Sequence, residues 1–322
     1  MINARRVAAL TVLIFLYIST PVSSFEGPVQ AKNHYPLFLH LNQPYMEKAD
    51  IENSMSYSLS HSSTYTVQES GEWIIRLDME ITELNFRYKR IINNFIEFGL
   101  DIPVLMFGGG FMDGFLEGYH DTFGFPDYGR SARPKNDFLY EVRKNGRLII
   151  EGKSGIRLGD IRLAVKKPLL SSDVCNLSLK MDLEIPVSNA KEGYSNGSLD
   201  TGISILMDKG ITQNIVTHLN VGAVFPGSVR GHEKLDVKNF IYGGAAVEMA
   251  VKDNLAFLVQ VLGQTRIYPV TDLRAVDREA VLIIFAGRYN TEKGGFDLSL
   301  TEDLSESGAP DFIINLTYKM DI

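Results

Sequence analysis

The chain has 322 residues, a formal net charge of −7 at neutral pH and a single cysteine, Cys175. An acidic chain has no electrostatic reason to bind nucleic acid, so no nucleic-acid partner is expected. A lone thiol cannot close an internal disulfide, which excludes a disulfide-stapled scaffold.

Residues 1–24 have the pattern of a secretory signal peptide. Two arginines precede an apolar run, residues 7–18, that is too short to span a bilayer as a helix. Val22 and Ser24 are small residues at the −3 and −1 positions of a cleavage site, so cleavage after Ser24 is expected. An uncleaved membrane anchor is the alternative. We expect an exported protein whose residues 25–52 form a periplasmic N-terminal segment.

Most of the remaining chain alternates between polar and apolar residues. Residues 54–68, 94–106 and 175–187 each place apolar side chains at every second position, which is the period of a β-strand. The polar faces carry closely spaced charges of both signs, and the segments are long enough to cross a membrane at a tilt. A soluble β-sandwich would also alternate, and it is the competing interpretation.

Loop lengths favour the membrane interpretation. Twelve strands are predicted, near residues 53–68, 72–88, 94–106, 155–167, 175–187, 198–208, 213–225, 240–251, 255–266, 278–290, 295–303 and 310–321. The turns on the N-terminal side are all short, whereas four of the six opposite connections are long: 107–154, 188–197, 226–239 and 267–277. An even strand count with short turns on one side and long loops on the other is typical of bacterial outer-membrane barrels.

We therefore predict an all-β fold, a transmembrane antiparallel up-and-down β-barrel of about 12 strands over residues 53–322. Its expected location is the outer membrane of a Gram-negative bacterium. The expected partners are outer-membrane lipid and, during biogenesis, the barrel-assembly machinery, while the oligomeric state stays open.

The connection at 107–154 contains the stretch GGGFMDGFLEGYHDTFGFPDYGR, residues 108–130. Its apolar residues recur every three to four positions, which predicts a helical insert after the third strand. Because glycines weaken this helix, it has to dock, either inside the lumen as a constriction or on the outer rim. We expect the constriction, with these residues: Phe111, Asp113, Phe115, Glu117, Tyr119, His120, Asp121 and Arg130.

The same insert offers two sharper hypotheses that the residues do not favour. Its carboxylates at helical spacing could bind a divalent cation, but the solvated face of an amphipathic helix is the favoured explanation, so no metal site or cofactor is predicted. His120 beside Asp121 would suit a rim hydrolase, yet no nucleophile motif accompanies them. No catalytic residue is predicted, and the protein is not expected to be an enzyme.

Residues 138–150 contain Asn145-Gly146 between two extended runs, which predicts a β-hairpin. The hairpin could stand beside the insert as a separate flap, or it could extend the neighbouring barrel strands beyond the bilayer.

The insert also resembles the signature of a proteobacterial family labelled as domain of unknown function three-one-eight-seven. Further similar stretches are GIRLGDIRLAVK at 155–166, LKMDLEIPVS at 179–188 and LTEDLSESGAPDFIINLTY at 300–318. The resemblance covers nearly all of the mature chain. It implies an outer-membrane barrel, and it implies no activity.

The favoured function is a passive channel or transporter for small solutes. Lumen charges set ion selectivity and orient solutes in such proteins. The residues expected to line the lumen are Arg76, Asp78, Glu80, Glu97, Asp101, Asp160, Arg162, Lys180, Asp182, Glu184, Glu248, Gln260 and Arg266. A structural or adhesion barrel, or a rim-sited hydrolase, is the alternative.

Overall fold

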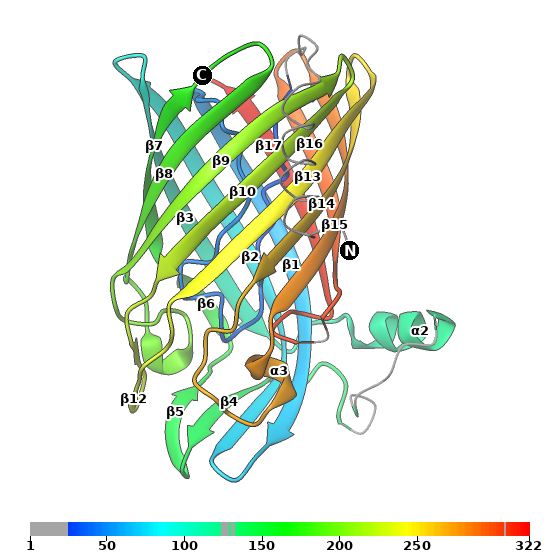
Figure 1. Ribbon diagram of the computed structural model, residues 1–322. Helices are drawn as coiled ribbons and strands as arrows, with labels where there is room; N and C mark the ends of the chain where they lie inside the picture. The colour runs from blue at the N-terminus through cyan, green and yellow to red at the C-terminus, as the bar shows by residue number, and fades with distance from the viewer. Residues whose placement is uncertain (1–24, 124–128, 130–132, 306) are drawn as a thin grey trace, which may run out of the picture.

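The structure is a computed structural model that describes residues 25–123, 129, 133–305 and 307–322. The expected signal peptide, residues 1–24, lies outside the described residues. Twelve long strands form a closed antiparallel barrel in which each strand pairs with the next and β17 returns to β1, as Figure 1 shows. The predicted all-β barrel of about 12 strands is confirmed.

The barrel strands follow the predicted segments closely. In chain order they are β1 Ser54–Glu69, β2 Trp73–Ile92, β3 Ile96–Gly108, β7 Ile161–Leu170, β8 Cys175–Ile185, β9 Asp200–Thr212, β10 Ile215–Phe225, β13 Phe240–Lys252, β14 Leu255–Gln264, β15 Ala280–Thr291, β16 Gly294–Asp303 and β17 Phe312–Asp321. The predicted strand at 155–167 is divided, because β6, Gly155–Leu158, pairs with β3 and is separated from β7 by two residues.

The two ends of the barrel differ. Short turns join the strands at one end, called here the short-turn end, where the C-terminus also lies (Figure 1). The opposite, long-loop end carries the short elements: α2 Asp113–Phe123, β4 Leu139–Lys144, β5 Arg147–Glu151, η2 Ala190–Glu192, β11 Val229–Arg230, β12 Lys234–Leu235 and α3 Arg274–Asp277. None of the helices in the described residues is long and apolar enough to cross a membrane.

The predicted hairpin at 138–150 is formed by β4 and β5. Asn145 and Gly146 have φ values of 51° and 72°, and two positive φ values in succession fit a two-residue hairpin turn. Strand β4 pairs with the first half of β2, so the hairpin extends the barrel sheet beyond the long-loop end. The alternative of a separate flap is wrong.

The long-loop end is closed by an apolar core, called here the cap. Side chains of β2, β4 and β5 meet residues of the loops that follow β10 and β14. The largest fully buried side chains of the cap include Trp73, Phe107, Tyr194, Phe240 and Tyr268. Close packing of this kind fills the lumen at this end of the barrel.

The outer wall of the barrel carries exposed apolar side chains around its circumference. They include Leu59, Leu84, Val165, Met181, Ile205, Val221, Val247, Val259, Phe285, Leu298 and Leu316. Apolar surface of this extent is not left in water by a soluble protein, and it matches the lipid-facing band of a membrane barrel. We call it the lipid belt.

The belt predicts a depth-dependent cost for charge on the outer wall. Val259 points outward near the middle of β14, whereas Val251 points outward at the short-turn end of β13. Val259→Arg should lower the free energy of unfolding by about 2–4 kcal/mol and Val251→Arg by about 0–1 kcal/mol. Equilibrium denaturation in lipid vesicles measures both, and equal costs would contradict the belt.

Candidate functional site

The lumen is the candidate site, and residues 25–52 occupy it. The sequence predicts a periplasmic position for this segment, but the structure places it inside the barrel, where almost every residue from Gly27 to Ala49 is buried. The segment runs into the lumen and back again, and its polar groups contact the wall in both arms. The segment, called here the plug, can leave bulk water because the charged wall supplies those partners.

The first arm of the plug runs from the short-turn end toward the long-loop end. Near its start, the Gly27 amide donates to a carboxylate oxygen of Glu248 (3.0 Å). Farther along, Lys32 pairs with Glu83 on β2 (2.9 Å). These contacts reach opposite sides of the barrel, so the arm crosses the lumen and does not follow one wall.

The tip of the plug, residues 35–41, lies in the cap. Leu37, Phe38 and Leu41 are fully buried there, and Phe38 packs against Tyr268 with ring centroids 6.0 Å apart. Burying each large apolar side chain stabilises the docked tip by about 1.5–3 kcal/mol. Burial also lowers the pKa of His40 to about 4, so this imidazole is neutral at physiological pH and brings no charge into the cap.

The second arm returns through the middle of the lumen and leads into β1. The hydroxyl of Tyr45 donates to Asp101 on β3 (2.9 Å). The guanidinium groups of Arg87 and Arg162 lie over its ring, with their central carbons 3.6 and 4.2 Å from the ring centroid. Tyr45 therefore joins a cation–π contact to a hydrogen bond at the centre of the barrel.

Glu47 forms the densest set of plug–wall contacts. Its carboxylate pairs with Lys180 on β8 and with Lys89 on β2 (2.7 Å). Its backbone N–H and carbonyl both bond to the side chain of Asn220 on β10 (2.8 and 3.0 Å). One plug residue thus connects β2 with β8 and β10 across the lumen.

The wall around Glu47 carries an excess of positive charge. Its ion-paired side chains contribute five bases, Arg87, Lys89, Arg162, Lys166 and Lys180, and three acids, Glu97, Asp101 and Asp182, which sum to +2. The plug carboxylates Glu47 and Glu52 both contact this network, and Glu52 also pairs with Lys48 of the plug and Lys319 of β17. At this level the plug therefore places carboxylates against the bases of the wall.

Little space remains beside the plug. Two cavities between the plug and the wall, one near Gln43 and one near Glu52, have volumes of about 20 Å³ each. A cavity of that size holds about one water molecule. The cavity that borders Glu47 is therefore too small for a solute.

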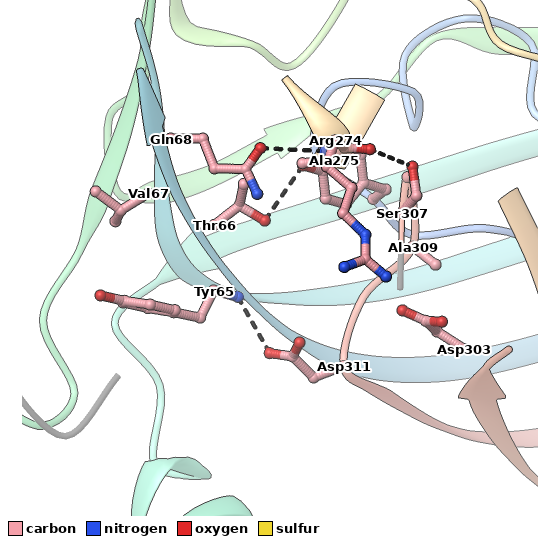
Figure 2. Close-up of a pocket in the computed structure, with 12 residues that line it drawn as sticks. Tyr65, Thr66, Val67, Gln68, Arg274, Ala275, Asp303, Ser307, Ala309 and Asp311 are labelled. Carbon is pink, nitrogen blue, oxygen red and sulfur yellow. Dashed lines mark hydrogen bonds between the residues drawn. The ribbon is translucent and has the colours of Figure 1, made fainter. Parts of the chain in front are cut away.

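Larger cavities lie at the two ends. One of about 400 Å³ opens at the short-turn end between the plug and the wall, near Asp50, Ser172 and His218. Another of about 150 Å³ lies at the long-loop end, where Figure 2 shows the Arg274 guanidinium pointing into a space that the carboxylates of Asp303 and Asp311 also border. The plug separates these two cavities.

Nine of the residues predicted to line the lumen lie on its wall or at its rim. These are Glu97, Asp101, Asp160, Arg162, Lys180, Asp182, Glu184, Glu248 and Gln260, and all are buried. An open lumen would leave these side chains in contact with water, whereas here they contact other protein groups. Asp160, for example, accepts a hydrogen bond from the Ser195 hydroxyl (2.7 Å), and burial raises its pKa.

Four predicted lumen residues lie elsewhere. Arg76, Asp78 and Glu80 are on the outward face of β2, because Trp73 to Ile81 point their apolar side chains into the cap. Arg266 is exposed in the loop after β14. The inward face of β2 changes from apolar to charged near residue 82, where the strand passes from the cap to the lumen. In the first half of β2 the charged residues therefore point outward, and the prediction that they line the lumen is wrong there.

The insert lies outside the barrel, so the predicted constriction is wrong. Phe111 stacks on His61 of β1, with ring centroids 4.9 Å apart, and Phe115 meets Phe312 of β17 at 6.1 Å. Both partners point outward from the wall. Among the acidic residues, Asp113 accepts a hydrogen bond from the Asn136 amide, Glu117 pairs with Lys135, and Asp121 is exposed.

Part of the predicted insert cannot be placed. Tyr119 and His120 belong to α2, but their side chains lie outside what the structure describes, as does Arg130 altogether.

The predicted lumen residues do not include Arg87 and Lys89, which contact Tyr45 and Glu47 of the plug. Arg87 and Lys89 alternate with Phe86 and Tyr88, so the period-two pattern already marks them as lumen residues. For residues 25–52 no comparable signal exists, because the segment contains no regular period. Only its mixture of charged and apolar residues distinguishes it from a polar tail.

Gly244 on β13 gives a test of plug docking. A Cβ atom at this position would lie 2.5 Å from the Met46 sulfur and 2.8 Å from its Cγ, so the plug uses the space that the missing side chain leaves. Gly244→Leu should destabilise the docked plug by about 1–3 kcal/mol. The fraction of barrels whose lumen is not filled by the plug, called here the open fraction, should rise about 5- to 150-fold. Single-channel recording in planar bilayers measures that fraction.

Gly243→Leu is the matched control. Gly243 points outward, and a Cβ there would meet no atom closer than 3.7 Å. If both variants raise the open fraction equally, the effect comes from the strand and the plug contact is irrelevant.

The barrel is similar in fold to solved structures of other proteins. The structure is similar to that of an outer-membrane channel from Pseudomonas putida F1, with 12% identity and a TM-score of 0.55 over 86% of this chain and 98% of that one. The NanC porin matches with 6% identity and a TM-score of 0.49 over 83% and 100% of the two chains. At these identities the likeness concerns the fold alone, and no curated protein sequence matches.

A family model described as "Protein of unknown function (DUF3187)" matches residues 19–322. This range contains the insert and the three other stretches on which the sequence resemblance rests, together with every barrel strand. The chain belongs to this DUF3187 family.

Proposed function

We propose that this protein is an outer-membrane channel for small anionic solutes, closed by its own plug. The observation that carries the proposal is the position of Glu47, a carboxylate held between Lys89 and Lys180 at the centre of the lumen. When the plug leaves, these lysines and their ion-paired neighbours present a local cluster with a net charge of +2 to water. Such a cluster attracts anions, and a carboxylate solute would take the place of Glu47.

The plug can move without disturbing the barrel. Every ladder of the barrel joins one wall strand to another, and the one backbone bridge recorded for the plug, between Lys32 and Tyr45, lies within the plug itself. Plug and wall are therefore joined by side-chain contacts, which can be exchanged for water or solute one by one. A permanently filled barrel would need no such ionic interface, because apolar side chains fill a lumen at lower cost.

A structural barrel is the second candidate, favoured by the apolar packing of the plug tip in the cap. It predicts that the lumen stays closed under all conditions. A rim hydrolase has less support, since His61, the histidine bonded to both Thr82 and Glu80, is covered by the Phe111 ring.

Deletion of residues 28–50 separates the channel from the structural barrel. In planar bilayers, the shortened protein should show steady conductance, whereas the full chain should be closed for most of the recording because the plug fills the lumen. Heat-modifiable migration on gels would verify that the shortened barrel is folded. A folded but non-conducting deletion variant would contradict the channel.

A disulfide lock tests the same point in the full chain. Met46→Cys and Gly244→Cys, in a Cys175→Ser background, place two thiols where the Met46 side chain now approaches β13 within disulfide reach. The oxidised protein should stay closed, and reductant should restore openings. Equal activity in both redox states would show that solutes pass without plug movement.

Anion preference is tested on the deletion variant. With a salt gradient across the bilayer, its reversal potential should indicate selectivity for chloride over potassium, because the exposed wall near Lys89 and Lys180 is positive. Lys89→Gln with Lys180→Gln removes two charges and should abolish the preference. An unchanged reversal potential in this variant would mean that these lysines do not select the solute.

A further inference from the structure

The insert is attached to the outer wall by a buried carboxylate. Glu80 is 3% exposed and accepts hydrogen bonds from the Phe111 and Met112 amides as well as contacting the His61 ring (2.7 Å). Gly110 makes this approach possible, since it has a φ of 70° and a Cβ there would lie 1.7 Å from the Glu80 carboxyl carbon. The start of the insert is therefore fixed against β1 and β2.

The helix that follows buries only part of its apolar surface. Met112 and Leu116 pack against Phe312, but Phe111 and Phe115 remain 74% and 56% exposed. Two large aromatic side chains close together, one just before α2 and one in its first turn, are not normally left in water. The helix has to have a further apolar contact.

These aromatic side chains lie at the edge of the lipid belt. His61, on which Phe111 stacks, pairs in register with Ile314, and the next outward pair toward the short-turn end is Leu59 with Leu316. All three aliphatic residues are exposed on the belt. Figure 1 shows α2 outside the barrel at the long-loop end, lying across the barrel axis and pointing away from the wall.

The polar side of the insert is turned to other protein groups. Asp113 is 5% exposed and accepts a hydrogen bond from the Asn136 amide (2.7 Å), while Glu117 pairs with Lys135 (2.5 Å). Both partners belong to the loop that leads toward β4. An amphipathic helix held in this way presents its apolar side to whatever lies next to the wall.

We propose that residues 111–117 lie in the boundary between lipid and water, with Phe111 and Phe115 in contact with acyl chains. The occupant of the apolar side is lipid because the lipid belt continues directly into it. Aromatic side chains favour this boundary, and amphipathic helices lie in its plane. The proposal rests on the membrane location given above and is independent of channel activity.

Quenching of tryptophan fluorescence by brominated lipid tests the contact. The native chain has one tryptophan, Trp73, which is buried in the cap away from the belt and gives a constant background. Phe115→Trp is reconstituted in phosphatidylcholine vesicles with and without brominated acyl chains. Leu84→Trp, a position in the lipid belt, gives the reference for full contact with acyl chains. Brominated lipid should reduce the added emission of Phe115→Trp by at least half as much as that of Leu84→Trp, because both indole rings contact acyl chains.

Val270→Trp is the matched control, since Val270 is exposed in a loop of the long-loop end and should not be quenched. Quenching of Leu84→Trp without quenching of Phe115→Trp would overturn this inference and leave the membrane location intact. Absence of quenching at Leu84 would overturn both. Emission of Phe115→Trp that changes with protein concentration but not with brominated lipid would assign the surface to a second copy of the chain. That outcome also contradicts the proposal.

Discussion

The ion pairs of Glu47 with Lys89 and Lys180 are the interaction on which the closed barrel depends. Each lysine is nearly inaccessible to water, and a buried charge without a partner costs several kcal/mol. Around Glu47 the ion-paired bases of the wall outnumber its acids, and the plug carboxylates Glu47 and Glu52 pair with those bases. Closure therefore has an electrostatic component at this level as well as one of shape.

The two halves of the plug are stabilised by different forces. Its tip is held by apolar burial in the cap, which is insensitive to salt, whereas its arms are held by ion pairs and hydrogen bonds to the wall. Under the proposed channel function, a solute that competes for the wall would loosen the arms and leave the tip in place. The cap would then limit how far the plug moves, and the wall would select the solute that replaces it.

The inner and outer surfaces of the same strands face different surroundings, the polar plug on the inside and lipid on the outside. On β1, Ser58 bonds to Gln30 of the plug, while its neighbour Leu59 is exposed on the lipid belt. The insert uses only the outer surface and the plug only the inner one. A change in the insert should therefore affect lipid contacts without opening the lumen, and the two regions can be studied separately.

The sequence by itself determined the barrel, because alternation with a period of two marks each strand and the loop lengths mark its two ends. It also determined the insert and the β4–β5 hairpin. Only the tertiary structure decided the side of the wall on which each segment lies. The inward face of β2 is apolar at Ile75 and charged at Arg87, since one meets the cap and the other the lumen. Residues 25–52 have no period of their own, and their place in the lumen follows from partners on distant strands.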